Sequence, residues 1–152
     1  MTLDHCGGPG DGGIDLRGTW AIPNLTGESS ETSRVFPVLV SCKAEKMKSG
    51  PKMIRELEGA IGSASRDTIG ILAATSPCTR GATQQMLLSP RALAYCCVKL
   101  YTDGGYMSQF VWNKPAGVLL QGLGASMRYS PGKEAEGELV LTLNGQVLRK
   151  PR

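Results

Sequence analysis

Apolar and polar residues alternate over residues 14–22, IDLRGTWAI, which predicts a half-buried strand. The apolar face of this strand holds Ile14, Leu16, Trp20 and Ile22. Its polar face holds Asp15, Arg17 and Thr19. The glycine-rich stretch before it, GGPGDGG at residues 7–13, predicts a turn.

A second alternating segment, VFPVLVSCKA at residues 35–44, predicts another strand with Pro37 at its start or edge. One face holds Val38, Val40 and Cys42, and the other holds Leu39, Ser41 and Lys43. A polar loop without a helical pattern, residues 23–34, joins the two strands, so we expect them to pair antiparallel. Cys42 is expected to face the core as a buried thiol. Because Lys43 adjoins it, a nucleophilic thiolate is the alternative interpretation.

Apolar residues at helical spacing over residues 51–61 predict a helix that Ser49 caps. Residues 79–88 predict a second helix. Short apolar runs at residues 69–75 and 93–101 predict buried strands.

The C-terminal part gives a weaker pattern. Residues 103–138 show no clear period, but residues 139–148, LVLTLNGQVL, predict a β-hairpin around Asn144-Gly145. The elements together predict a mixed α/β (α+β) domain, with a core at residues 1–102 and a β-rich C-terminal extension at residues 103–152.

Composition is that of a globular domain, with 152 residues of which 41% are hydrophobic. The apolar runs are too short to span a membrane, and the first ten residues lack the basic and apolar regions of a signal peptide. The five cysteines are an odd number without a CxxC pair, which favours reduced thiols over disulfides or a zinc site.

Charge is unevenly distributed along the chain. Residues 1–33 hold five acidic residues and one basic residue, whereas residues 34–152 hold sixteen basic and eight acidic residues. An acidic pocket beside a basic body suits a protein that holds a divalent cation and a phosphate backbone together. A net charge of +4 is also common among soluble proteins, so charge alone does not establish nucleic-acid binding.

Three glycines match a dinucleotide-binding motif by position only. Gly8, Gly10 and Gly13 fit GxGxxG, but that motif needs a strand before it and a helix after it. Here a strand follows, and Asp11 would repel a pyrophosphate. The match does not predict a dinucleotide site.

Asp15 and Lys43 form the more informative pair. Antiparallel pairing of their strands would bring Asp15 near Ser41 and Lys43. A carboxylate there would bind Mg²⁺, which activates a water and neutralises phosphate charge, and a lysine would orient that water or stabilise developing negative charge. A surface aspartate paired with a lysine remains the plainer interpretation.

A basic run follows this pair. Lys46, Lys48, Lys52 and Arg55 cover a loop and the start of the predicted helix, and phosphate backbones attract such clusters. A solvated surface is the more common reason for a run of this kind.

Four blocks in order, GDGGIDLRG, VLVSCK, IRELEGAIG and GILAATSPCTRGA, resemble the Mrr-like branch of the PD-(D/E)xK restriction-endonuclease fold. More narrowly, these blocks and the later RALAYCC and FVWNKPAG resemble the fungal mitochondrial family named Required for respiratory growth protein 7. The resemblance implies a mixed sheet flanked by helices and a mitochondrial location.

The resemblance also implies roles for individual residues. Asp15 would be the metal-binding aspartate and Lys43 the motif lysine, with Asp11 and Ser41 as further candidate metal ligands. Ser41 stands where the motif has Glu or Gln, and a hydroxyl is a poorer Mg²⁺ ligand than a carboxylate or amide. The acids that could compensate are Glu45, Glu56 and Glu58.

Members of this fold carry a helix before the first strand, and almost no sequence precedes Gly7 here. Either the chain is a fragment, or the domain has lost that helix. We expect its absence to expose one face of the sheet.

Three functions follow as expectations. The first is a mitochondrial protein required for respiratory growth with a Mg²⁺-dependent nuclease-like site that hydrolyses phosphodiesters in DNA or RNA. The second is a catalytically degenerate nuclease fold that binds nucleic acid or a protein partner in mitochondrial genome maintenance or expression. The third is a structural accessory protein without nucleic-acid contact.

Overall fold

The computed structural model describes residues 1–8, 10, 12–23, 33–44, 48–102, 104–129 and 137–148. Six strands form the main sheet, and they are ordered in space as they are in the chain. They are β1 (Thr2–His5), β2 (Leu16–Pro23), β3 (Ser33–Lys43), β4 (Ile69–Ala74), β5 (Leu93–Tyr101) and β6 (Gly104–Trp112). The pairs β3–β4 and β4–β5 are parallel and the others are antiparallel, so the expected mixed α/β class is confirmed.

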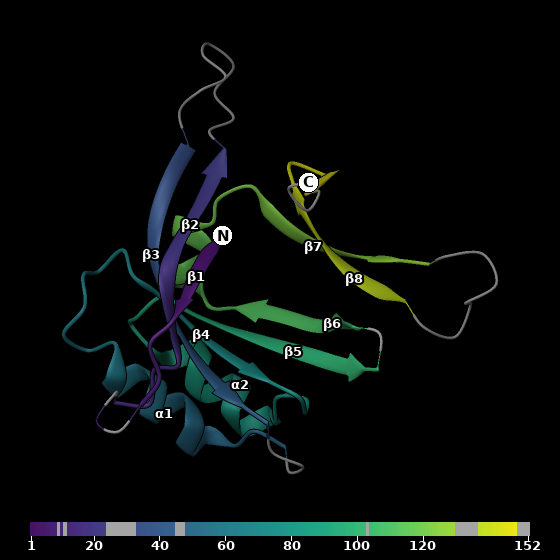
Figure 1. The fold of residues 1–152 in the computed structure, drawn as a ribbon. Coiled ribbons are helices and arrows are strands. Elements are labelled where there is room, and N and C mark those ends of the chain that lie inside the picture. The colour runs from purple at the N-terminus through teal and green to yellow at the C-terminus, as the bar shows by residue number, and fades with distance from the viewer. Residues whose placement is uncertain are drawn as a thin grey trace.

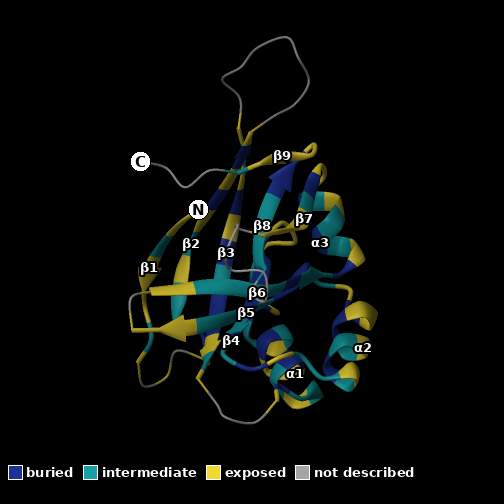
Figure 2. Cartoon of the chain, turned by 90° about the vertical axis from the view of Figure 1, so that its right-hand side faces the viewer, coloured by how far each residue is buried: buried dark blue, intermediate teal, exposed yellow. Residues whose placement is uncertain are grey.

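Two helices cover one face of this sheet (Figure 1). Both are crossover connections, α1 (Pro51–Ala60) between β3 and β4 and α2 (Arg80–Leu88) between β4 and β5. Their inner surfaces form one core cluster with the sheet, and Figure 2 shows exposed residues on their outward surfaces. The buried members of this cluster are Ile14, Ile54, Leu57, Ile61, Leu72, Ala74, Ala82, Met86, Leu93, Tyr95 and Cys97.

The C-terminal elements close the opposite face. The short helix α3 (Lys114–Leu119) is followed by a three-stranded sheet of β7 (Leu123–Arg128), β8 (Glu138–Leu143) and β9 (Gln146–Val147). The β7–β8 ribbon lies across the main sheet from the two helices (Figure 1). Leu120, Leu123 and Leu143 are buried there in one cluster with residues of the main sheet, including Trp20 and Phe110.

The predicted helices and buried strands are present, with one error in capping. Gly50 occupies the N-cap of α1, and no side chain caps that helix. Ser49 is buried instead, with its Oγ 3.0 Å from the hydroxyl of Tyr95. Thr79 caps α2, because its Oγ1 accepts a hydrogen bond from the backbone N–H of Ala82.

The C-terminal part holds more structure than its sequence pattern predicts. β6, α3 and β7 lie within residues 103–138, where no period is visible. The predicted hairpin is confirmed in β8 and β9, whose turn has Asn144 at φ 48° and Gly145 at φ 80°. Two successive positive φ angles are those of a type I′ turn. The division between residues 102 and 103 stays a prediction.

Two assignments of side chains to faces are wrong. Ile14 precedes the ladder of β2 and packs with the residues of α1, not with Trp20 and Ile22. Cys42 is exposed rather than buried, because it lies beyond Leu16↔Val40, the last β2–β3 pair at that end.

Part of the helix-side face remains uncovered among the described residues. Thr19, Ala21, Val35 and Pro37 are exposed on β2 and β3, and Val35 is 57% exposed. Exposure of one sheet face was expected from the sequence. Of the described helices, none has the length and apolar character required to cross a membrane.

Candidate metal and phosphate site

The Asp15 carboxylate is held at the point where β2 and β3 separate. The backbone N–H of Asp15 donates to the carbonyl of Val40 at 2.8 Å, and its own carbonyl accepts from the N–H of Cys6 at 2.9 Å. Its side-chain Oδ2 accepts a hydrogen bond of 2.6 Å from the backbone N–H of Cys42. The carboxylate thus accepts the hydrogen bond that a backbone carbonyl of a paired strand would accept, and it lies directly beside the backbone of Cys42.

Ser41 and Lys43 lie at the end of β3, next to the central strand of the sheet. They pair in register with Leu72 and Ala74 of β4, and the carbonyl of Lys43 accepts from the N–H of Thr75 at 3.2 Å. Ser41 is only 4% exposed, whereas Lys43 is half-buried. The ion pairs found among the described residues do not include one between Asp15 and Lys43.

The donor atoms at this site are few. Oδ2 of Asp15 is already hydrogen-bonded, which leaves Oδ1, an atom that would lie 3.3 Å from a Cβ at Gly7. In the described part of the chain, no three His, Cys, Asp or Glu side chains gather as a metal site. These residues do not form a closed protein cage, and one carboxylate oxygen could ligate only an ion that keeps most of its waters.

The acids that could compensate for Ser41 have other contacts or are not described. Glu56 lies 3.7 Å from the ammonium of Lys52 in an exposed pair on α1. Glu58 accepts a hydrogen bond of 2.7 Å from the Oγ of Ser89 at the end of α2. Asp11, Glu45 and Lys46 lie outside the described residues.

The remaining members of the basic run lie on the surface close to this edge. Lys48, Lys52 and Arg55 are all exposed, on the segment before α1 and on its first turns. Their positive charges face solvent. This exposure agrees with a phosphate-binding surface and equally with an ordinary solvated surface.

The Cys42 thiol is not activated. Partial burial and the negative charge of Asp15 raise its pKa above the ordinary value of 9.0, and Lys43 only partly opposes them. Burial also raises the pKa of its neighbour Cys96 to about 11. Both thiols are therefore protonated at neutral pH, which argues against a thiolate nucleophile.

The sequence did not reveal the polar contacts behind the site. The fully buried Tyr95 hydroxyl donates to the carbonyl of Ser76 at 2.5 Å and meets Ser49. Gln109 of β6 accepts from the N–H of Cys78 through its side-chain oxygen at 3.3 Å. These contacts join loops that follow β3 and β4 to the neighbouring strands, and only tertiary structure brings them together.

Comparison with known proteins identifies the family. The model of the family described as "Required for respiratory growth protein 7" matches residues 28–128. A protein of Schizosaccharomyces pombe named as an uncharacterized mitochondrial protein is 44% identical over 116 residues. The match covers 75% of this chain and 44% of that relative, so the chain spans less than half of the relative's length. No solved structure matches.

The family match covers β3 to β7 and so includes Ser41, Lys43 and the basic run, and the relative extends the likeness to three quarters of the chain. The mitochondrial location expected from the sequence is confirmed by the family and by the relative's name. This chain belongs to the Required for respiratory growth protein 7 family, a mitochondrial family with a role in respiratory growth.

Proposed function

We propose that the Asp15–Lys43 edge is a Mg²⁺-dependent site for phosphodiester hydrolysis in DNA or RNA. One observation carries the proposal, the hydrogen bond of 2.6 Å between Asp15 Oδ2 and the N–H of Cys42. That bond fixes a carboxylate beside the residue that precedes Lys43. In metal-assisted hydrolysis the protein fixes the position of the ion, and a carboxylate held in place at this edge supports that role.

The residues would divide the work as follows. Asp15 would hold the ion through Oδ1, and the bound ion would supply Lewis-acid charge to the phosphate. Lys43 would orient the attacking water and stabilise negative charge that develops on the phosphate oxygens. Lys48, Lys52 and Arg55, together with Lys46, would hold the phosphate backbone beside the site.

The second candidate is a member of this fold that binds nucleic acid or a protein partner without cleavage. It is favoured by Ser41, whose hydroxyl is short, neutral and part of a residue only 4% exposed. A buried hydroxyl is a poor ligand for a hydrated ion. The site therefore has one carboxylate, from Asp15, and lacks the second acid or amide that the motif has at the position of Ser41.

The test compares nuclease activity of the wild type with that of Asp15→Asn and Lys43→Ala on circular DNA and structured RNA, with Mg²⁺ or Mn²⁺. We expect each substitution to reduce cleavage by about 100-fold or more, because each removes a charge that acts in the transition state. Asp67→Asn is the matched control, because Asp67 is exposed on the loop before β4.

The outcomes separate the candidates. A folded wild type that cleaves nothing, yet binds nucleic acid with an affinity that falls as salt rises, would leave the binding function. Equal cleavage by wild type and both variants would show that the activity does not come from this site. Absence of both cleavage and binding would point to a protein partner.

A further inference from the structure

A hollow of about 550 Å³ lies over α3, away from the Asp15–Lys43 edge. Its lining residues are Trp112, Asn113, Lys114, Gly117, Val118 and Gln121. Trp112 pairs with Ala94, near the start of β5. Lys43 is level with the other end of that strand, because it pairs with Ala74 of β4, and Ala74 pairs with Cys97. The hollow is therefore at the other end of the strands, and it is broadly open to solvent.

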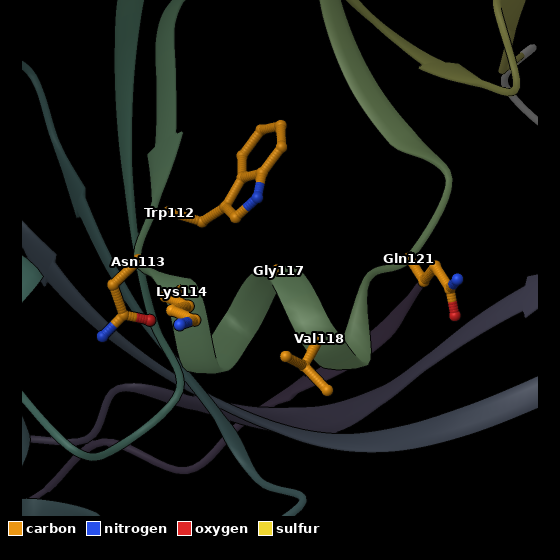
Figure 3. Close-up of a pocket in the computed structure, with 6 residues that line it drawn as sticks. All are labelled: Trp112, Asn113, Lys114, Gly117, Val118 and Gln121. Carbon is orange, nitrogen blue, oxygen red and sulfur yellow. The ribbon is translucent and has the colours of Figure 1, made fainter.

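The indole of Trp112 forms one wall of this hollow. Figure 3 shows it rising beside α3, with Gly117 on the adjoining turn of the helix. Its ring packs against Phe110, at 5.6 Å between centroids, and Trp112 is only half-buried. A Cβ at position 117 would lie 3.4 Å from the indole Nε1, so this turn of α3 runs close to that edge of the ring.

Positive charge accompanies the ring. Lys114 is exposed, and no acidic residue is among those that line the hollow. Arg34 reaches the same rim, where its guanidinium donates to the carbonyl of Gln121 at 2.9 Å. The surroundings thus favour a ligand that carries negative charge.

Asn113, by contrast, is committed to the fold. Its Oδ1 accepts from the N–H groups of Leu93 and Ala116, and its Nδ2 donates to the carbonyls of Met86 and Arg91. The groups left for a ligand are the aromatic ring, the ammonium of Lys114 and the side-chain amide of Gln121. A flat ring can stack on the first, and an anion can pair with the second.

We propose that this hollow binds a nucleotide unit, with its base stacked on Trp112 and its phosphate paired with Lys114. Stacking on an accessible part of an aromatic side chain, beside a cation, is the usual way in which proteins hold an unpaired base. The unit would come either from a single strand of nucleic acid or from a free nucleotide. The site does not depend on hydrolysis at Asp15 and would persist in a protein without nuclease activity.

Tryptophan fluorescence tests this directly, because the chain has two tryptophans in different surroundings. Trp20 is 5% exposed and packed edge-on against Phe110, so it is shielded from a stacked base. Titration with oligothymidylate and with AMP, in the absence of divalent metal, should quench the emission saturably. Trp112→Phe, checked for folding by circular dichroism, should show no quenching.

Two further variants test the assignment of groups. Trp112→Ala should weaken binding by about 5-fold to 100-fold through loss of stacking. Lys114→Gln should lower the salt dependence of oligothymidylate binding by about one phosphate contact. Arg80→Gln, at an exposed position at the start of α2, should leave the titration with AMP unchanged.

Comparing the two probes identifies the source of the nucleotide. Quenching at much lower concentration by oligothymidylate supports a single strand as the ligand, and equal or tighter binding of AMP supports a free nucleotide. The proposal is overturned if folded wild type shows no saturable quenching with either probe, or if Trp112→Phe is quenched to the same extent. The titration is repeated with Asp15→Asn, which removes the proposed nuclease activity. The quenching should persist in this variant, so nucleotide binding at α3 is tested separately from the nuclease site.

Discussion

Asp15 has two separable contributions, one to structure and one to chemistry. Its Oδ2 accepts from the N–H of Cys42 at the end of the β2–β3 ladder, and its charge raises the pKa of the Cys42 thiol. An asparagine keeps an acceptor at this place but removes the charge. An alanine removes both.

Asp15→Ala should therefore lower the free energy of unfolding by about 1–2 kcal/mol, since a hydrogen bond to a charged group is lost at a half-exposed position. Asp15→Asn should retain most of the stability. Urea denaturation of the two variants measures the difference. Asp67→Ala, at an exposed loop position, should change stability by less than about 0.5 kcal/mol.

The thiol of Cys42 provides a second measurement at the same residue. Burial and the Asp15 charge raise its pKa, so its alkylation by iodoacetamide should reach half its maximal rate only above pH 9.0. Asp15→Asn removes a negative charge that disfavours the thiolate, so the midpoint should move to lower pH while burial still keeps it raised. Peptide mapping by mass spectrometry at a series of pH values reports this rate for Cys42 alone. An unchanged midpoint would contradict the placement of the Asp15 carboxylate.

Alternation of residues predicted the two strands that pair antiparallel as β2 and β3, but it did not predict where the core stops. Cys42 continues the apolar face of Val38 and Val40, yet it lies past the last β2–β3 pair and is exposed. Burial at a strand end depends on what the neighbouring chain covers, which no local pattern contains.

At the scale of elements, Asn113 connects four segments of the chain. It is 1% exposed, and it joins the start of β5, the ends of α2 and its following loop, and the first turn of α3. Removing its side chain would leave several buried backbone groups without a partner, each costing about 1–3 kcal/mol.

Asn113→Ala should therefore destabilise the protein by about 3–5 kcal/mol in thermal or urea unfolding. Gln84→Ala, on the exposed surface of α2, is the matched amide control and should change stability by less than about 0.5 kcal/mol. A small effect of Asn113→Ala would mean that water replaces the amide contacts.

The sequence pattern missed the elements β6 and α3 for different physical reasons. The pairing of β6 with β5 shifts register between Cys97 and Val98, and such an irregularity breaks the alternation of apolar residues. α3 has six residues and contains Pro115 and Gly117, so it is too short for a helical period. The elements α1, α2, β4 and β5 have regular patterns, and their bounds agree closely with the prediction.

On the scale of the whole molecule, the C-terminal sheet is part of the main core. Leu143 is 6% exposed and belongs to the same cluster as Trp20, Val38 and Phe110. The stability of the six-stranded sheet should therefore depend on residues near the end of the described chain.

Leu143→Ala should reduce the free energy of unfolding by about 2–4 kcal/mol, because it leaves a cavity under the main sheet. We expect circular dichroism and tryptophan fluorescence to report one shared transition at a lower denaturant concentration. Leu88→Ala, at an 82% exposed position of α2, should have little effect. Separate transitions for the two probes would show that the C-terminal sheet unfolds on its own.

The order of the strands has a consequence for biosynthesis. Because β1 to β6 pair in the order in which they occur in the chain, each strand can join the sheet as it emerges from the ribosome. The helix-covered face can close once α1 and α2 are present, but the opposite face must wait for Leu120, Leu123 and Leu143. Until those residues arrive, the nascent protein carries a nearly complete sheet with one apolar face in contact with water, and we expect chaperones to bind it there.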